Sequence, residues 1–458
     1  MNSKRFYLNN NYIIFYFIFY YSILLKLGFP LPYGDDLFFL GTSLHYERTG
    51  EYLNPGVEDF CLSFSDINKP YWFVPFHMQM MGWWLKLTGI TDLTVRFYII
   101  LCSLTTTIFV WLLAKQYRSD TLLTVFSLPL IISFGYTWSF RPECTAIPLF
   151  IIGLYLIQKK KNFITIWGAI SCFGLSTISS QILLIPSVLM IISNYLDNKN
   201  YINLSKYYLV IILCALQTSI IGLYIINFEI FDFFEMYRNH ISKMSMTIFE
   251  SMDLFIYITC KLGNGYILKF PSYIIIIIMT IVYINKKGIN YTLIAYISSL
   301  IIMILIYAKS ELTILFLCTL YTLLITFLVN INKNIIIIVI TSLVCLKSAS
   351  VFFLNVYINK DNSTNNLPIL DENTTYVIDE YTIREPLNWN LPPKWKMIPG
   401  YGCYDEQITK KPKDEIWIVS SKNLSYYYPN LFSHKKYAFL EKEFSNISPK
   451  LWKYEIIK

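Results

Sequence analysis

Residues 11–36 read NYIIFYFIFYYSILLKLGFPLPYGDD, a long apolar run that ends in two adjacent aspartates. A bilayer core is ~30 Å thick, so a helix that rises 1.5 Å per residue needs roughly 20 apolar residues to cross it. Residues 11–29 reach that length, and no small-residue cleavage site follows them as it would in a signal peptide. We therefore predict a retained first membrane span, with Asp35 and Asp36 at the membrane surface.

The whole chain has the composition of a membrane protein. Of its 458 residues, 55% are hydrophobic and 15% are charged, and the mean hydropathy is +0.46, which is too apolar for a soluble fold of this length. The net charge of +8 does not indicate a nucleic-acid partner, because Lys and Arg lie mostly in short loops between apolar runs. The nine cysteines form no CxxC pair, so they predict no metal or redox motif.

Further apolar runs extend the first span to an all-α polytopic membrane protein of about 11 transmembrane helices. They cover residues 96–114, 121–139, 142–157, 163–177, 182–196, 207–228, 271–285, 291–308, 312–329 and 334–353. Basic residues in alternate loops fall on one side of this arrangement, and the positive-inside rule makes that side the cytoplasm. We expect a multi-pass protein of the inner (plasma) membrane with a cytoplasmic N-terminus.

Longer segments are left on the outer face, at residues 30–95, at residues 229–270 and in the C-terminal tail. The tail has a soluble composition, and Pro, Gly and Asn separate near-alternating runs at 375–379, 415–420 and 451–457. This pattern predicts a transmembrane domain over 1–356 and a small extracytoplasmic α/β domain over 357–458.

Asp35 and Asp36 open the first outer segment directly after a span. A carboxylate that is partly desolvated beside a second carboxylate can act as a general base toward a hydroxyl or an amine. A solvated pair at a helix end is the alternative, and the two aspartates taken alone fit that alternative better. Their neighbours in the sequence therefore decide how the pair is interpreted.

The same segment continues with Thr49-Gly50-Glu51-Tyr52, a Lys69-Pro70 step, Trp83-Trp84, Gly89 and Arg96. This order resembles the first periplasmic loop of the GT-C glycosyltransferases, specifically the group of protein O-mannosyltransferases and lipid A aminoarabinose transferases. The resemblance covers residues 11–200 well and the remaining spans by topology. Two positions depart from the group, since Asp36 stands where Glu is usual and Tyr71 replaces a second proline.

The resemblance implies roles for several residues. Asp35 matches the catalytic Asp of the group, with Asp36 as its acidic neighbour, and Lys69 matches the lysine that contacts the phosphate of the lipid-linked sugar. Arg96 and Arg141 are the other expected contacts of the donor phosphate. The alternatives are a snorkelling lysine for Lys69, a headgroup anchor for Arg96 and a structural ion pair for Arg141.

Four further residues are expected to line the substrate cavity. They are Glu143 in the step Phe140-Arg141-Pro142-Glu143, Gln181 in a polar turn, and Arg238 and His240 in an amphipathic stretch. Structural alternatives are an ion pair for Glu143 and helix-end hydrogen bonding for Gln181. His45, His77 and His240 share no metal-ligand spacing, so we expect no metal and no other cofactor.

These features predict an enzyme that moves a sugar from a polyprenyl-phosphate donor to a glycan, lipid or protein acceptor on the outer face. Asp35 would activate the acceptor, which attacks the anomeric carbon opposite the phosphate, so inversion is expected. An O-antigen polymerase, a lipid-linked sugar flippase or transporter and a non-catalytic scaffold remain alternatives. A flippase would carry its charged residues along a path inside the helices.

Overall fold

The computed structural model of this chain describes only part of its residues. They are residues 10–30, 36–54, 69, 71, 74–117, 122–135, 140–159, 162–198, 204–244, 290–307, 324, 373–378, 383, 389–397, 415–419, 437–441 and 450–456. The spans predicted at 271–285, 312–329 and 334–353 lie outside these residues, apart from Leu324.

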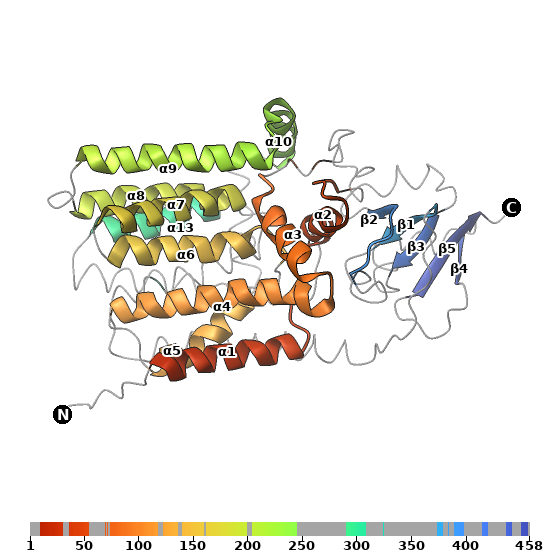
Figure 1. The fold of residues 1–458 in the computed structure, drawn as a ribbon, viewed down its shortest axis with the longest axis horizontal. Coiled ribbons are helices and arrows are strands. Elements are labelled where there is room, and N and C mark those ends of the chain that lie inside the picture. The colour runs from red at the N-terminus through yellow and green to blue at the C-terminus, as the bar shows by residue number, and fades with distance from the viewer. Residues whose placement is uncertain are drawn as a thin grey trace.

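Eight of the predicted spans form helices with bounds close to those expected. They are α1 (Asn10–Lys26), α4 (Asp92–Gln116), α5 (Leu122–Gly135), α6 (Glu143–Lys159), α7 (Phe163–Ser179), α8 (Leu184–Asn198), α9 (Leu204–Ile225) and α13 (Tyr291–Tyr307). Figure 1 shows these helices gathered into one bundle. In the described part of the chain, α4 and α9 are long and apolar enough to cross a membrane, and the total of eleven spans stays a prediction.

Large apolar side chains fill the inside of the bundle. Phe17 of α1 and Trp111 of α4 are almost fully buried and meet edge to face, with ring centroids 6.1 Å apart. α9 buries Tyr207 and Val210 in a cluster with residues of α7. The exposed side of α9 carries Leu209, Ile212, Leu213, Leu216 and Ile220. Such an apolar helix surface needs cover by lipid or by another apolar surface.

Capping residues set where the helices begin. Thr91 Oγ1 accepts a hydrogen bond from the Thr94 amide at 3.1 Å, and Thr94 Oγ1 accepts one from the Thr91 amide at 2.9 Å. This capping box satisfies two amides that the helix itself leaves without partners, and Asp92 in the first turn complements the positive end of the helix dipole. α4 therefore begins four residues before the apolar run that starts at Arg96.

Three shorter helices lie at the end of the bundle that faces the sheet (Figure 1). They are α2 (Asp36–Thr49), α3 (Phe76–Thr88) and α10 (Ile230–Met244). α2 and α3 pack closely, because Ser43 Oγ donates to the Met78 carbonyl at 3.0 Å and because a Cβ on Gly82 would lie 2.6 Å from the Tyr46 ring.

The chain bends sharply between α9 and α10. Asn227 and Phe228 have φ angles of 51° and 60°, in the left-handed region that ends a helix. The Phe228 amide donates back to the Leu223 carbonyl at 2.9 Å, which satisfies an otherwise open carbonyl of α9. α10 consequently leaves the bundle direction, as Figure 1 shows.

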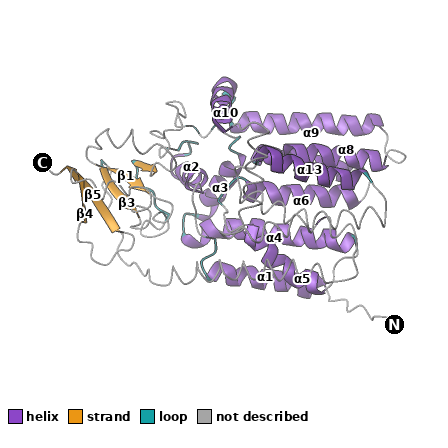
Figure 2. Cartoon of the chain, turned by 180° about the vertical axis from the view of Figure 1, so that it is seen from behind, coloured by secondary structure: helices purple, strands orange, loops and turns teal. Residues whose placement is uncertain are grey.

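The C-terminal region contains a five-stranded mixed sheet (Figure 2). Its strands are β1 (Thr375–Ile378), β2 (Trp395–Met397), β3 (Glu415–Val419), β4 (Tyr437–Glu441) and β5 (Lys450–Ile456), in the order β2-β1-β3-β5-β4. β1 pairs in parallel with β2 and β3, whereas β5 pairs antiparallel with β3 and β4. The three strands predicted from alternation are confirmed, and β2 and β4 were not predicted. The domain boundary near residue 357 lies outside the described residues, so the α/β class and the domain limits stay predictions.

Candidate functional site

Most described candidate residues lie on or beside α2, α10 and the turn before α6, whereas Arg96 lies in the first turns of α4 and Gln181 lies just before α8. α2 and α10 are at the end of the bundle nearest the sheet (Figures 1 and 2). Asp35 is outside the described residues. Asp36 is the first residue of α2, where the helix dipole favours a negative charge, and its side chain is outside the described part. The aspartate pair therefore directly precedes and opens a helix that packs on α3.

Lys69 lies against the start of α10. Its Nζ is 2.7 Å from Glu229 Oε2 and 3.5 Å from Asp232 Oδ2, and it is 5.7 Å from the centroid of the Tyr71 ring. Burial raises the pKa of Glu229, but hydrogen bonds from Lys69 and Tyr71 outweigh it and bring that pKa below its ordinary value. Lys69 is thus a cation held between two carboxylates rather than a lysine that extends into open solvent.

Tyr71 fixes the loop that carries Lys69. Its hydroxyl contacts the Glu229 carboxylate and the Ile226 carbonyl, and its ring is buried beside Ile226 and Met236. Burial, followed by the hydrogen bond to Glu229, raises the pKa of Tyr71. Tyr71, which stands where the similar glycosyltransferases have a second proline, therefore anchors the first outer segment to α10.

α10 also reaches the predicted polar turn at Gln181. Tyr237 Oη donates to Gln181 Oε1 at 2.8 Å, and the Tyr237 ring stacks on Phe233 with centroids 5.7 Å apart. The Gln181 side chain therefore meets α10, which is more than the helix-end hydrogen bonding considered as its alternative. One helix thus connects Lys69 with Gln181.

Arg141 and Glu143 lie in a turn that is fixed by its neighbours. Phe140 is fully buried, and Ser179 Oγ donates to the Pro142 carbonyl at 3.1 Å. Glu143 Oε1 accepts a hydrogen bond from Ser180 Oγ at 3.5 Å, while Glu143 Oε2 is buried with no hydrogen-bond partner among the described residues. A buried carboxylate oxygen in this condition can accept a hydrogen bond from a ligand.

His77 of α3 joins the same turn to the bundle. Its Nε2 is 3.0 Å from the Phe140 carbonyl and its Nδ1 is 2.8 Å from Thr145 Oγ1. Because the carbonyl only accepts, Nε2 carries the proton and Nδ1 accepts from Thr145. Burial lowers the pKa of His77 to about 4, so the ring is neutral at physiological pH. This role of His77 was not predictable from the sequence, since a histidine among aromatic residues is usually a packing residue.

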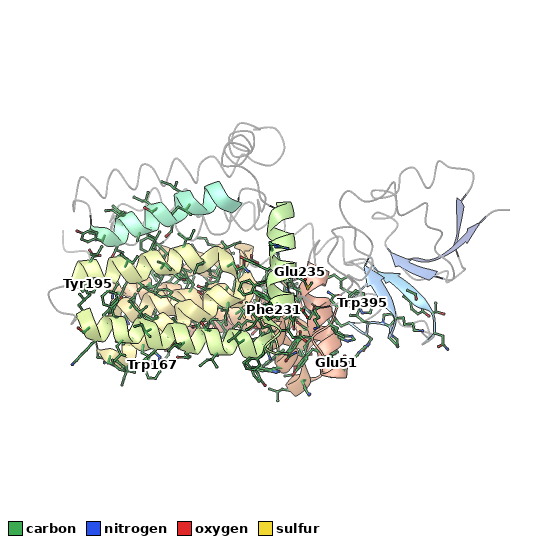
Figure 3. The ribbon with its side chains drawn as sticks, turned by 90° about the horizontal axis from the view of Figure 1, so that it is seen from above. Glu51, Trp167, Tyr195, Phe231, Glu235 and Trp395 are labelled. Atoms are coloured by element: carbon green, nitrogen blue, oxygen red, sulfur yellow. The ribbon has the colours of Figure 1, made fainter. Side chains whose placement is uncertain are left out.

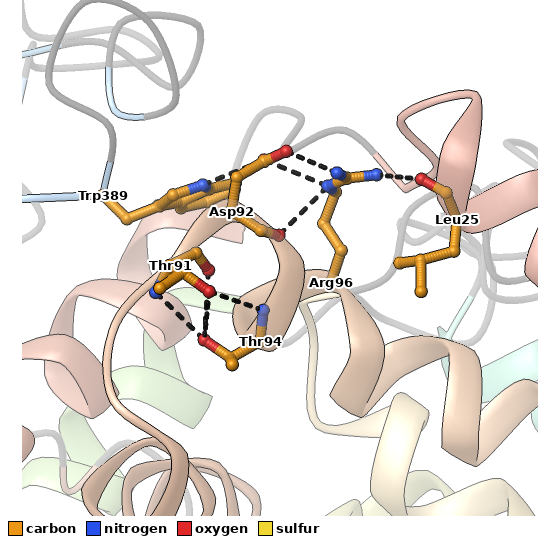
Figure 4. A network of polar contacts seen from close by, with 6 residues as sticks. All are labelled: Leu25, Thr91, Asp92, Thr94, Arg96 and Trp389. Carbon is orange, nitrogen blue, oxygen red and sulfur yellow. Dashed lines mark hydrogen bonds and ion pairs between the residues drawn. The ribbon is translucent and has the colours of Figure 1, made fainter.

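Arg96 belongs to a network that links α1, α4 and the C-terminal region (Figure 4). Its guanidinium donates to the Asp92 carboxylate and to the Leu25 carbonyl at the end of α1, at 2.5 Å. Asp92 Oδ1 also accepts from Trp389 Nε1 at 3.0 Å. The contacts seen for Arg96 are therefore structural ones, and its role at a phosphate stays a prediction.

The remaining predicted residues of α10 are less defined. Arg238 is exposed, and the side chain of His240 lies outside the described part. Sequence reasoning assigned no role to Glu229, Asp232 or Trp389, which the structure places beside the predicted residues, and it noted Tyr237 only as part of the amphipathic stretch with Arg238 and His240. Figure 3 shows other members of this region, with Phe231 and Glu235 on α10 and Trp395 beside the helices of the first outer segment.

No family model matches this chain, and no curated protein matches its sequence. Its fold is similar to that of ArnT from Cupriavidus metallidurans in the apo state, with a TM-score of 0.55 and 10% identity over 96% of this chain and 97% of that one. It is also similar to ArnT from the same organism bound to undecaprenyl phosphate, with a TM-score of 0.52, 9% identity and the same shares covered. At this identity the likeness shows the fold alone, and the mostly helical architecture predicted from the sequence agrees with that fold.

Proposed function

We propose that this protein is a membrane glycosyltransferase that takes its sugar from a polyprenyl-phosphate donor. The observation that carries the proposal is the likeness of fold, over almost the whole chain, to ArnT, which was crystallised with undecaprenyl phosphate. The order of motifs from Asp35 to Arg96 supports it independently, because it was read from the sequence alone. Both observations support a polyprenyl-phosphate donor.

Asp35 would act as the general base. It would take the proton of an acceptor hydroxyl or amine, whose oxygen or nitrogen forms the new bond to the anomeric carbon. The bond from that carbon to the phosphate oxygen breaks, and its electron pair leaves with the polyprenyl phosphate. Attack opposite the leaving phosphate inverts the configuration of the sugar.

Lys69 and Arg141 would hold the donor phosphate. Negative charge grows on the phosphate as the bond to the sugar breaks, and a positioned cation stabilises that charge. Lys69 is a compact point charge, whereas Arg141 can bind a phosphate through two parallel donors. Arg96 remains a third predicted contact, although its guanidinium donates to Asp92 and Leu25 in the structure.

Glu143 and Gln181 would lie beside the sugar. Both side chains are half-buried. Ser180, which directly precedes Gln181, donates its hydroxyl to Glu143. A buried carboxylate oxygen can accept a hydrogen bond from a sugar hydroxyl. Arg238 and His240 of α10 would lie at the entrance of the acceptor.

The acceptor and the subgroup are finer parts of the proposal. We propose an envelope glycan or lipid A as the acceptor, with a protein as the third choice, and a relation to the protein O-mannosyltransferase and lipid A aminoarabinose transferase group. The site would open on the outer face of the inner membrane, with the C-terminal domain outside. A donor that is already lipid-linked needs no nucleotide-binding domain.

Transfer of a labelled sugar tests the activity. Membranes that contain the natural protein or Asp35→Asn at equal abundance are supplied with polyprenyl-phosphate sugars, and Glu51→Gln, an exposed carboxylate of the same segment, serves as the control. We expect Asp35→Asn to lose transfer by at least about 100-fold, the scale of general-base catalysis, while it still binds polyprenyl phosphate. Unchanged transfer would remove Asp35 as the base. No transfer by the natural protein with any donor would favour a polymerase or a transporter.

A further inference from the structure

The segment from Trp389 to Trp395 in the C-terminal region touches two elements of the candidate site. Trp389 is fully buried and has a φ of 64°, a left-handed conformation that is costly for a tryptophan. Its ring lies 5.8 Å from the ring of Phe140, and its indole donates to Asp92. Such a conformation persists only where the surroundings fix it.

The same segment also binds α2 through hydrogen bonds and close packing. Arg48, near the end of α2, donates to the Leu391 carbonyl and to Asn390 Oδ1, the latter at 3.0 Å. Trp395 presses on Gly41 in the middle of α2, where an added Cβ would lie 2.6 Å from the indole. Trp395 is itself buried, so this contact has the packing of a core rather than of a loose domain contact.

The turn at Phe140 is therefore held from several sides. Trp389 packs on the Phe140 ring, His77 donates to the Phe140 carbonyl, and Ser179 donates to the Pro142 carbonyl. Arg141 and Glu143 lie in this turn, and Asp36 opens α2. The segment 389–395 thus contacts both the element that carries the proposed phosphate ligand and the helix that follows the proposed base.

We propose that segment 389–395 is a positioning element, which sets the turn at Arg141 and the helix that follows Asp35 relative to each other. Trp389 and Arg48 are positioning residues, because Trp389 acts through the turn at Phe140 and Arg48 acts through α2. This inference rests on the proposed function. The physical reason is that group transfer is sensitive to placement, and a misplacement of ~1 Å can slow a reaction by about 100-fold.

Two variants of the full-length protein separate the contact of segment 389–395 with the turn at Phe140 from its contact with α2. Trp389→Leu removes the contact with the turn, so we expect the Kd for polyprenyl phosphate without sugar and the KM for the donor to rise by about tenfold, with a smaller change in kcat. Arg48→Met releases α2, so we expect kcat to fall by about tenfold with little change in Kd. Trp389→Phe, which keeps an aromatic ring on Phe140, should retain most of the binding.

Trp167→Leu is the matched control. Trp167 is also an indole donor, to Gln217 at 3.1 Å, but it lies on the bundle well away from Trp395 (Figure 3). We expect this variant to bind and transfer as the natural protein does. A merely structural role would lower abundance and thermal stability without separating Kd from kcat.

The outcomes distinguish this inference from the proposed function. If Trp389→Leu and Arg48→Met both keep the Kd and kcat of the natural protein, the positioning role is wrong, while the glycosyltransferase proposal still stands. If Trp389→Leu does not fold, Arg48→Met decides, and a rise of its Kd as large as the fall of its kcat would count against the positioning role. Failure of the natural protein to bind polyprenyl phosphate would overturn the function itself, and the positioning role with it.

Discussion

Lys69 lies between two carboxylates, so any phosphate that binds its ammonium must compete with Glu229 and Asp232. The three side chains are partly exposed, and such ion pairs contribute about 0.2–1 kcal/mol because water screens them. A phosphate that binds the Lys69 ammonium can therefore displace these pairs at a small cost in free energy. The carboxylates would hold Lys69 in place before the donor arrives and then release it.

Glu229→Gln should therefore bind polyprenyl phosphate more tightly. The loss of one competing charge predicts a Kd lower by roughly two- to fivefold, which is the fold-change that ~0.4–1 kcal/mol produces. Glu235→Gln, on the exposed side of the same helix, is the control for a general change of charge. Titration of each variant with the carrier lipid measures the effect, and weaker binding by Glu229→Gln would show that Glu229 supports the phosphate site instead.

His77 predicts a pH dependence of stability. Burial lowers its pKa in the folded protein to about 4, from an ordinary 6.5. The neutral ring therefore contributes its full share of the free energy of unfolding above pH 6.5. That contribution is lost as the pH falls from about 6.5 toward 4, by about 3 kcal/mol in all.

His77→Gln tests that pH dependence, because glutamine can still donate to the Phe140 carbonyl but does not titrate. We expect this variant to be less stable at pH 7.5 and to lose less stability than the natural protein between pH 6.5 and pH 4. Thermal unfolding of the purified protein across this pH range gives both curves. Parallel curves would show that the acid sensitivity arises from other groups.

At the scale of elements, glycines set how closely the helices approach. A Cβ on Gly174 of α7 would lie 2.2 Å from Thr218 Oγ1 and 3.2 Å from Thr218 Cβ on α9. Rotation of the Thr218 side chain moves its hydroxyl but not its Cβ, so α7 and α9 would have to separate. Small residues at such crossings are typical of helices that pack within membranes.

Gly174→Ala is accordingly expected to destabilise the protein by about 1–3 kcal/mol, the usual cost of overpacking. Gly222→Ala provides the matched comparison, because a Cβ at Gly222 of α9 meets no described atom within 4 Å. That substitution should be neutral or stabilising by up to about 1 kcal/mol, since alanine favours a helix more than glycine does. Midpoints of thermal unfolding compare the two, and equal midpoints would remove the packing argument.

The helices of the bundle were largely predictable from the sequence, while the connections at its outer end were not. Apolar length determines where a helix can cross lipid, and eight predicted spans match described helices to within a few residues. The start of α4 was missed because Thr91 and Asp92 are polar capping residues that lie before the apolar run. β2 was missed because the three residues Trp395–Met397 are too short for alternation to show.

At the scale of the whole molecule, Asp92 connects three parts of the chain. It accepts from Trp389 of the C-terminal region and pairs with Arg96 of its own helix, while Arg96 donates to the Leu25 carbonyl of α1 (Figure 4). The Arg96 side chain is 8% exposed and the Asp92 side chain is 33% exposed. Removal of one partner of such a pair leaves the other charge poorly solvated.

Asp92→Asn should thus destabilise the protein by about 2–3 kcal/mol, less than for a fully buried pair because Asp92 is partly exposed. Addition of Arg96→Met removes the unpaired charge and should restore stability to within about 1 kcal/mol. Binding of polyprenyl phosphate by the double variant, as by the natural protein, would show that the Arg96 guanidinium serves only its protein partners, Asp92 and Leu25. Loss of binding at restored stability would instead support Arg96 as a phosphate ligand.

The candidate site could be predicted in its residues but not in its partners. Lys69, Arg141, Glu143 and Gln181 were found from motif order, which reports the type of chemistry. Lys69 pairs with Glu229, Gln181 accepts from Tyr237, and His77 contacts the Phe140 carbonyl beside Arg141. These contacts join segments that are distant in the sequence, and a single sequence gives no signal for such pairs. Trp389 was missed for the same reason, since a tryptophan in an irregular segment resembles any surface aromatic residue.

The hydrogen bond from Arg48 to the Leu391 carbonyl joins residues that are 343 positions apart. A ribosome that adds about 5–20 residues per second needs roughly 20 to 70 s to make the chain between them. Throughout that time α2 is already synthesised, yet the segment that covers Gly41 does not exist. The proposed donor site is therefore assembled only near the end of translation, and a chain cut short before Trp389 could enter the membrane but would lack the fixed geometry that sugar transfer requires.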